Sequence, residues 1–91
     1  MANFDAEHNK GKVKRLYPAQ DRLWFTLGGS GSVTAMNPKD GYYYILVTNN
    51  NFAGLYGLVY LCAEHGWTLK VRTLDNLVGG WAEVSYLVVD F

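Results

Sequence analysis

Alternating apolar and polar positions predict five β-strands along this chain. The clearest alternation is the sequence WTLKVRT at residues 67–73, where apolar side chains occupy every second position from Trp67 to Val71. Successive side chains of a strand point to opposite faces, so this period of two is typical of a half-buried strand. The other predicted strands are residues 12–17, 22–27, 42–47 and 81–91.

The last predicted strand differs from the others because both of its sides are apolar. The residues expected together on one side are Val84, Tyr86 and Val88. Apolar residues also occupy the other side, and this pattern is typical of a strand that is covered on both faces.

Residues that favour turns separate these strands. Pro18 and the three residues after it join the first two strands as a hairpin. The glycine-rich sequence GGSGS at residues 28–32 predicts a flexible break in the chain. A phosphate-binding loop would need a Lys-Ser/Thr ending and a helix directly after it, and neither is present. The break is therefore interpreted as a hairpin connection or a bulge at a strand edge.

A helix is predicted over residues 52–64, because apolar residues recur there at spacings of three and four. The residues of this first apolar side are Phe52, Leu55, Tyr56, Val59, Cys62 and Ala63. Asparagines at positions 49–51 suit the start of the helix, and Gly66 suits a left-handed stop after it.

The same helix carries a second apolar side, formed by Gly54, Gly57, Leu58 and Leu61. A helix that is apolar nearly all round is buried nearly all round. Each glycine inside a helix also costs about 1 kcal/mol relative to alanine, which is understandable where another backbone approaches closely. These four residues are therefore the predicted interface of a homo-oligomer. The alternative is that the polar N-terminal arm covers them.

The order of elements is strand, strand, strand, helix, strand, strand, and it predicts a mainly β protein with one helix. This order fits an OB-like five-stranded Greek-key barrel. A chain of 91 residues has the size of one domain. Residues 1–91 are therefore expected to form a single OB-like domain, with residues 1–10 as a polar arm.

Composition narrows the classes of function. The chain has 8 Lys+Arg and 8 Asp+Glu, and a net charge of zero argues against a general nucleic-acid binder. Hydrophobic residues make up 49 % and charged residues 18 %, so a domain this small needs an unusually large core or buries apolar surface against a partner. The single cysteine, Cys62, cannot form an internal disulfide and is interpreted as a small buried hydrophobe.

The sequence predicts no membrane span and no signal peptide. The longest apolar-leaning run, residues 52–63, is shorter than the roughly 20 residues that a spanning helix needs. Residues 1–14 lack the apolar stretch of a signal peptide. The sequence leaves two alternatives for the compartment. The protein is cytoplasmic, or it is periplasmic or secreted if a signal peptide has been removed.

Several stretches of the chain resemble a known family. They are GKVKRLY at residues 11–17, LWFTLGG at 23–29, NFAGLYGLVY at 51–60 and GWTLKVR at 66–72. In these stretches the chain resembles the OB-fold B subunits of subtilase cytotoxin and typhoid toxin, which belong to the pertussis-like toxin class. It also resembles related small secreted bacterial proteins of unknown function, chiefly in the ending EVSYLVVDF at residues 83–91.

The resemblance implies a secreted homo-oligomer, a pentamer in the toxins, that binds host glycans and assembles with an enzymatic toxin subunit. It places the glycan site beside the first strand. The residues at matching positions are Asp5, His8 and Asn9, and the candidate site also includes Lys10 and Lys12 nearby. The chain departs from the family where the toxin subunits carry a disulfide, because Thr26 and either Ala35 or Met36 stand at those positions.

The residue types favour binding over catalysis. Only His8 and His65 are near-neutral acid–base groups, and no cluster has the spacing of metal ligands, so no enzymatic activity, cofactor or metal is expected. With 3 Trp and 7 Tyr, the chain is rich in side chains that stack on sugars and nucleobases. The first hypothesis is a non-enzymatic glycan-binding module. The alternatives are a single-stranded nucleic-acid binder, using Lys70 and Arg72 beside the basic first strand, and an orphan structural or inhibitory protein-interaction domain.

Overall fold

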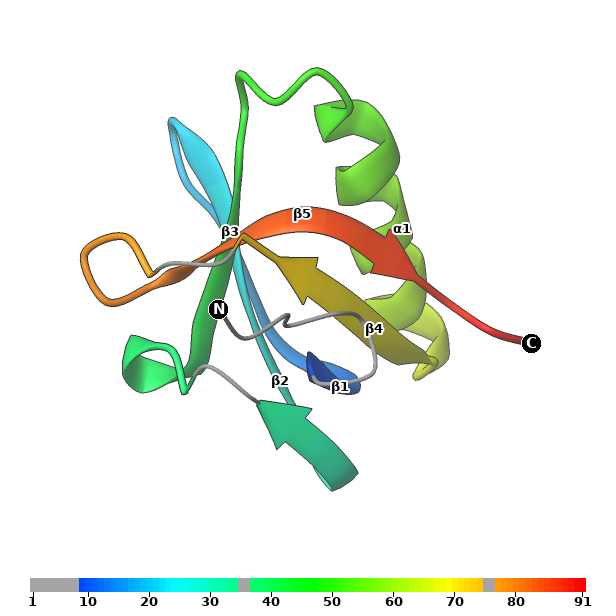
Figure 1. The fold of residues 1–91 in the computed structure, drawn as a ribbon. Coiled ribbons are helices and arrows are strands. Elements are labelled where there is room, and N and C mark those ends of the chain that lie inside the picture. Colours follow the sequence, from blue (N-terminus) through cyan, green and yellow to red (C-terminus); the bar gives the residue numbers. More distant parts are fainter. Residues whose placement is uncertain (1–8, 35–36, 75–76) are drawn as a thin grey trace.

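The computed structural model describes residues 9–34, 37–74 and 77–91, which form five β-strands in one sheet and a single α-helix (Figure 1). The elements follow one another in the predicted order, with a short 3-10 helix added before the third strand. Their bounds are β1 (Asn9–Pro18), β2 (Arg22–Thr34), η1 (Lys39–Gly41), β3 (Tyr42–Leu46), α1 (Phe52–His65), β4 (Thr68–Thr73) and β5 (Ala82–Val88).

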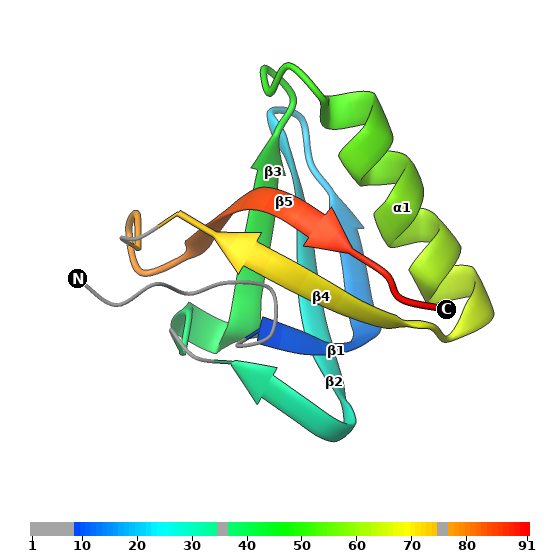
Figure 2. The ribbon, with the colours of Figure 1, turned by 45° about the vertical axis from the view of Figure 1, so that its right-hand side comes forward.

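Hydrogen-bonded pairing joins the strands in the order β1, β2, β3, β5, β4, and β4 pairs in turn with β1. All neighbours are antiparallel except β3 and β5, which run parallel and pair only at Tyr43–Ala82 and Tyr44–Glu83. The helix α1 lies against one side of the sheet, where it contacts β1, β3, β4 and β5 (Figure 2). The mainly β fold with one helix is therefore confirmed.

The core lies between the helix and the inner side of the strands. Its side chains come from alternate strand positions, as the period of two predicts, and from one side of α1. The buried hydrophobic members are Leu23, Phe25, Tyr43, Ile45, Leu55, Val59, Cys62, Leu69, Val71, Ala82 and Val84. Leu69 and Val71 were expected to face inward on β4, and Cys62 was expected to be buried, so these predictions are confirmed.

The glycine-rich segment is not a break, because β2 continues through it to Thr34. The pairing with β1 passes from Lys12–Gly28 directly to Lys10–Val33, so several β2 residues lie outside the regular ladder. Gly29 and Gly31 take φ values of 91° and 80°, which only glycine adopts without strain. Positive φ lets the strand bend away and return to pairing, so the interpretation as a bulge is confirmed and the interpretation as a hairpin connection is wrong.

The alternation in β5 shifts by one residue. Arg72 pairs with Tyr86 but Thr73 pairs with Val84, so Ser85 is an extra, bulged residue. Val84 is buried, whereas Tyr86 is 47 % exposed and Leu87 packs against the core. The prediction that Val84, Tyr86 and Val88 share one side is therefore wrong beyond Val84, because the bulge reverses the faces.

The helix α1 buries Leu55, Val59 and Cys62 and ends at His65, with Gly66 as its cap. Gly66 has a left-handed φ of 68°, and its N–H donates to the Cys62 carbonyl at 2.9 Å, so the predicted stop is confirmed. Ala63 is exposed, which corrects its assignment to the buried side. In the described part of the chain, no helix is long and apolar enough to cross a membrane.

Candidate functional site

The strand register places two rows of side chains on the side of the sheet away from the core. One row crosses four strands as Tyr17, Trp24, Tyr44 and Glu83, which are paired in that order. The other row crosses three strands as Arg15, Thr26 and Tyr42. Because Leu23 and Phe25 point into the core, their neighbours on β2 must point outward. These two rows, together with Lys14, Asp40 and Trp81, are called the outer face below.

A bulge in β1 brings two cations to the outer face. Val13 pairs with Leu27 and Arg15 with Thr26, so Lys14 is an extra residue in the strand. In a regular strand, consecutive side chains point to opposite faces, but a bulge re-aims them. Lys14 and Arg15 are both exposed and both line the same hollow.

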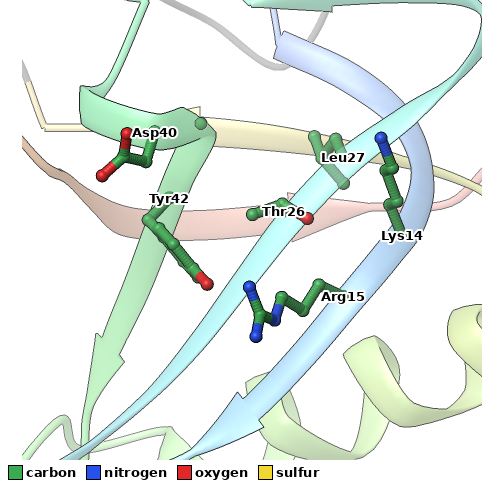
Figure 3. Close-up of a pocket in the computed structure, with 7 residues that line it drawn as sticks. Lys14, Arg15, Thr26, Leu27, Asp40 and Tyr42 are labelled. Atoms are coloured by element: carbon green, nitrogen blue, oxygen red, sulfur yellow. The ribbon is translucent and has the colours of Figure 1, made fainter.

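This hollow, called the cationic hollow, opens over β1, β2 and the turn before β3, with about 770 Å³ of open space (Figure 3). Its lining residues are Lys14, Arg15, Thr26, Leu27, Asp40, Gly41 and Tyr42. In Figure 3 the Arg15 guanidinium and the Tyr42 hydroxyl point toward each other beside Thr26, whereas the Lys14 amine extends in another direction. The hollow thus offers two positive charges, two hydroxyl groups and one carboxylate to a ligand.

The turn at η1 places Asp40 at the rim of the cationic hollow. Asp40 and Gly41 take φ values of 54° and 77°, so two successive residues are left-handed. Aspartate and glycine are among the residues that adopt this region most readily. The turn is tied to the β5 side of the molecule by Lys39, whose N–H donates to the Gly80 carbonyl at 2.7 Å.

A second hollow adjoins the first and is mainly aromatic. This aromatic hollow, of about 300 Å³, is lined by Tyr17, Trp24, Asp40, Tyr42 and Trp81. It therefore shares Asp40 and Tyr42 with the cationic hollow.

Trp24 lies at the centre of the aromatic hollow. Its ring meets those of Tyr42 and Trp81 edge-on, with centroids 5.8 Å and 5.3 Å away. Such edge contacts are favourable because the positive edge of one ring meets the negative face of another. They hold the three rings in a fixed arrangement.

Tyr44 lies beneath this cluster and is only 2 % exposed, although it belongs to the outer row. Burial raises the pKa of Tyr44, and the negative charge of Glu83 adds to the rise. The Arg22 guanidinium covers the ring of Tyr44, with its Cζ 4.8 Å from the centroid. Lys39 covers one face of Trp81 in the same way, at 5.2 Å. These cation–π contacts support the rings on the outer face.

The ligand residues implied by the resemblance are not brought together as one surface. Asp5 and His8 lie outside the described residues. Asn9 is fully buried, and its Oδ1 accepts a hydrogen bond from the Tyr43 hydroxyl at 3.0 Å, so its side chain offers nothing to a ligand at the surface. Lys10 and Lys12 lie where β1 pairs with β4, half-buried and exposed respectively.

The aromatic residues of the outer face could have been singled out from the strand pattern. In the sequence RLWFTL, Trp24 falls on the same side as Arg22 and Thr26, and a tryptophan among polar residues signals an aromatic surface. The sequence carried no such signal for the place of Lys14 on the outer face, because a bulge does not follow from the local pattern.

The predicted oligomer residues lie on α1, but they do not all face outward. Gly54, Gly57 and Leu61 are exposed, with Leu61 at 45 %, whereas Leu58 is half-buried and packs against the core. Leu58 therefore lies between the core and the exposed side of the helix. Leu16 of β1 and five α1 residues line an open apolar hollow beside it. The five are Gly57, Tyr60, Leu61, Ala63 and Glu64.

The two helix glycines have different surroundings. A Cβ on Gly54 would lie 2.6 Å from the Asn51 side-chain oxygen, so the glycine leaves room for that side chain. A Cβ on Gly57 would meet no atom within 4 Å. The folded chain therefore gives a local reason for Gly54 and none for Gly57.

Groups suited to metal binding are not gathered in the described part of the chain. No set of three or more His, Cys, Asp or Glu residues there is placed to hold a metal ion. Burial raises the pKa of the Cys62 thiol, which disfavours the reactive thiolate.

Comparison with protein-family models, curated proteins and solved structures found no match to this chain. The resemblance to the toxin B subunits stays a prediction.

Proposed function

We propose that this chain is a non-enzymatic binding module that holds a glycan on its outer face. The observation that carries the proposal is the ring cluster of Trp24, Tyr42 and Trp81, which opens directly beside the cations of the cationic hollow. Sugar rings combine an apolar C–H side, which stacks on aromatic rings, with hydroxyl groups that bind charged and polar side chains. The outer face offers both kinds of contact within two adjoining hollows.

We propose further that the sheet is an OB-like Greek-key barrel. The pairing order β1, β2, β3, β5, β4, with β4 returning to β1, supports this assignment. OB barrels use the side of strands 2 and 3 to bind oligosaccharides and oligonucleotides. Two rings of the cluster belong to β2 and β3, and the third, Trp81, belongs to the segment before β5.

The proposed molecule is a homo-oligomer that associates through the exposed side of α1. Tyr60 and Leu61 are 39 % and 45 % exposed there, next to a glycine that the folded chain does not require. Exposed apolar groups in a cluster mark interaction surfaces. The toxin resemblance adds three further points to this proposal. They are that the oligomer is a pentamer, that it assembles with an enzymatic toxin subunit, and that the protein is secreted.

The first experiment screens the labelled protein on a glycan array and then titrates the best ligand by calorimetry. Arg15→Ala and Tyr42→Ala are expected to weaken binding at least tenfold, because each removes a side chain that lines the cationic hollow. Two controls are expected to bind as the wild type does. Tyr86→Ala removes an exposed aromatic residue elsewhere on β5.

The second control, Lys12→Ala, removes an exposed cation at the position favoured by the toxin resemblance. Loss of binding in Lys12→Ala with full binding in Arg15→Ala would move the site to the start of β1, beside the residues favoured by the toxin resemblance. No binding to any glycan would remove the proposal.

Single-stranded nucleic acid is the second candidate, because rings beside cations also form stacking platforms for bases. The zero net charge of the chain argues against nucleic-acid binding. We expect no binding of a fluorescent single-stranded oligonucleotide at physiological salt. Tight, salt-sensitive oligonucleotide binding with an empty glycan array would favour this candidate instead. If both assays are negative, the orphan protein-interaction domain is the remaining candidate.

A further inference from the structure

We infer that the connection between β4 and β5 inserts exposed aliphatic side chains into the surface of a phospholipid bilayer. The side chains are Leu74, Leu77 and Val78, which are between 38 % and 55 % exposed and are called the apolar tip below. The inference goes beyond the proposed glycan binding and does not rest on it, because it needs no sugar on the membrane.

Backbone hydrogen bonds turn two residues of the apolar tip to the outer side of the sheet. The Leu74 N–H donates to the Glu83 carbonyl at 3.0 Å, one position after the buried Thr73. Because consecutive side chains of a strand point to opposite faces, Leu74 points away from the core. Val78 and Trp81 exchange two hydrogen bonds, of 2.8 Å and 3.0 Å, and such directly paired residues project to the same side. The apolar tip therefore extends the outer face beyond Trp81.

A tight turn holds the apolar tip away from the body of the molecule. Gly79 and Gly80 take φ values of 63° and 93°, and a two-residue hairpin turn of this kind needs positive φ at both positions. The Lys39 N–H donates to the Gly80 carbonyl at 2.7 Å and fixes the turn to η1. Figure 1 shows the end of this connection, drawn in orange, projecting from the sheet. A projecting tip suits a bilayer, whose lipids move aside, whereas a protein partner would need a matching hollow.

The residues at the base of the apolar tip suit the headgroup layer of a membrane. Trp81 and Tyr42 each combine an apolar ring with a polar group, and such residues gather at membrane–water interfaces. Lys39 is exposed, and its Nζ lies 5.2 Å from the centroid of the Trp81 ring. A lysine stem lies along apolar surface while its charge reaches the lipid phosphates. Arg15 offers a further exposed cation on the outer face.

Asp40 limits what these cations contribute. It follows Lys39 in the chain and is exposed, so its carboxylate opposes the phosphates of an anionic membrane. The excess of positive charge at this end of the outer face is therefore small. We expect apolar insertion to supply most of the binding, and anionic lipid to strengthen it about fivefold, the effect of roughly one cation near the surface.

The test is sedimentation of the full chain with lipid vesicles that carry no sugar. One set consists of phosphatidylcholine alone, and the other of equal parts of phosphatidylcholine and phosphatidylglycerol. We expect binding to both sets, with the preference for the anionic set given above. Lipids with brominated acyl chains are expected to quench tryptophan fluorescence, and Trp81→Phe is expected to lower that quenching because Trp81 lies beside the apolar tip.

Matched variants separate insertion from attraction between charges. Val78→Ser is expected to weaken binding to both sets about tenfold, because an inserted valine side chain no longer leaves water. Val47→Ser, at an exposed valine in the connection between β3 and α1, is the control and is expected to bind as the wild type does. Lys39→Gln is expected to remove the preference for anionic vesicles and to leave binding to phosphatidylcholine unchanged. Circular dichroism confirms that each variant is folded.

Several outcomes would overturn the inference. They are no sedimentation with either set, and equal losses in Val78→Ser and Val47→Ser. Binding to anionic vesicles that is lost in Lys39→Gln but kept in Val78→Ser would also overturn it, because charge would then act without insertion. If the vesicles are not bound and light scattering shows that Val78→Ser dissociates an oligomer, the apolar tip contacts another copy of the chain instead. An empty glycan array would remove the proposed function and leave vesicle binding as expected here.

Discussion

Tyr43 and Asn9 show how a single polar pair is held inside this core. Both side chains are fully buried, and the Tyr43 hydroxyl donates to Asn9 Oδ1 at 3.0 Å. The two residues are 34 positions apart, so the bond joins the first strand to the third. A buried hydrogen bond of this kind is worth little net energy when made, but leaving one partner unsatisfied is expensive. Asn9 therefore acts in the core rather than at the surface predicted for it.

Tyr43→Phe is expected to lower the free energy of unfolding by about 1–2 kcal/mol, because it removes the hydroxyl from a buried acceptor. Urea unfolding followed by tryptophan fluorescence measures the change. Tyr86→Phe, at an exposed tyrosine of β5, is the matched control and is expected to change stability little. Equal stability of Tyr43→Phe and the wild type would contradict a structural role for the bond.

Tyr43 also makes the free energy of unfolding depend on pH. Burial raises the pKa of Tyr43 above its ordinary value, so the folded state holds the phenolic proton more tightly than the unfolded state does. At a pH above about 10, unfolding releases this proton, and the free energy of unfolding therefore falls as the pH rises. Below that pH both states keep the proton and the contribution is fully present.

We expect the urea midpoint to fall from pH 9 to pH 11, and to fall less steeply in Tyr43→Phe. Burial also raises the pKa of Tyr44, so part of the slope remains in that variant. An unchanged slope in Tyr43→Phe would show that Tyr43 does not carry the effect.

At the scale of elements, bulges decide which side chains this sheet presents. The Lys14 bulge in β1 gathers cations on the outer face, and the Ser85 bulge in β5 turns Leu87 toward the core and Tyr86 toward solvent. Each bulge needs only one extra residue, and each reverses the faces of everything after it. Neither leaves a mark in the local apolar pattern, and for this reason the faces of β5 were predicted wrongly.

The glycines of α1 give a test at the same scale. Gly57→Ala is expected to raise the free energy of unfolding by about 1 kcal/mol, because alanine favours the helix and its Cβ meets open space. Gly54→Ala is expected to raise the free energy of unfolding by less, since the Asn51 side chain must first move away. Thermal unfolding of dilute protein measures both. A loss of stability in Gly57→Ala would show that its surroundings are tighter than the folded chain indicates.

At the scale of the whole molecule, the unpartnered surface is the exposed side of α1. The hollow beside Gly57 and Leu61 is lined mainly by apolar residues, with Glu64 as its charged member. A chain with 18 % charged residues has few charges to cover such a surface. Association between copies through this side would remove it from water, which is the favourable term in most protein–protein contacts.

We expect light scattering after size exclusion to show a homo-oligomer at micromolar concentration. Leu61→Glu is expected to give a folded monomer, because a charge at the interface must be desolvated when copies associate. Tyr86→Glu is the matched control, since Tyr86 is as exposed as Leu61 but lies on β5. A monomeric wild-type protein, or equal dissociation in both variants, would remove the role proposed for the exposed side of α1.

The sequence by itself determined the order of the elements, the helix with its stop at Gly66, and the inward positions of β4. These features follow from local periods and from the conformational freedom of single glycines, which are properties of neighbouring residues. Only the tertiary structure decided that Trp24, Tyr42 and Trp81 form one cluster, and that Asn9 is buried. The reason is physical: strand partners and bulges are set by hydrogen bonds between segments far apart in the chain, and no local pattern records them.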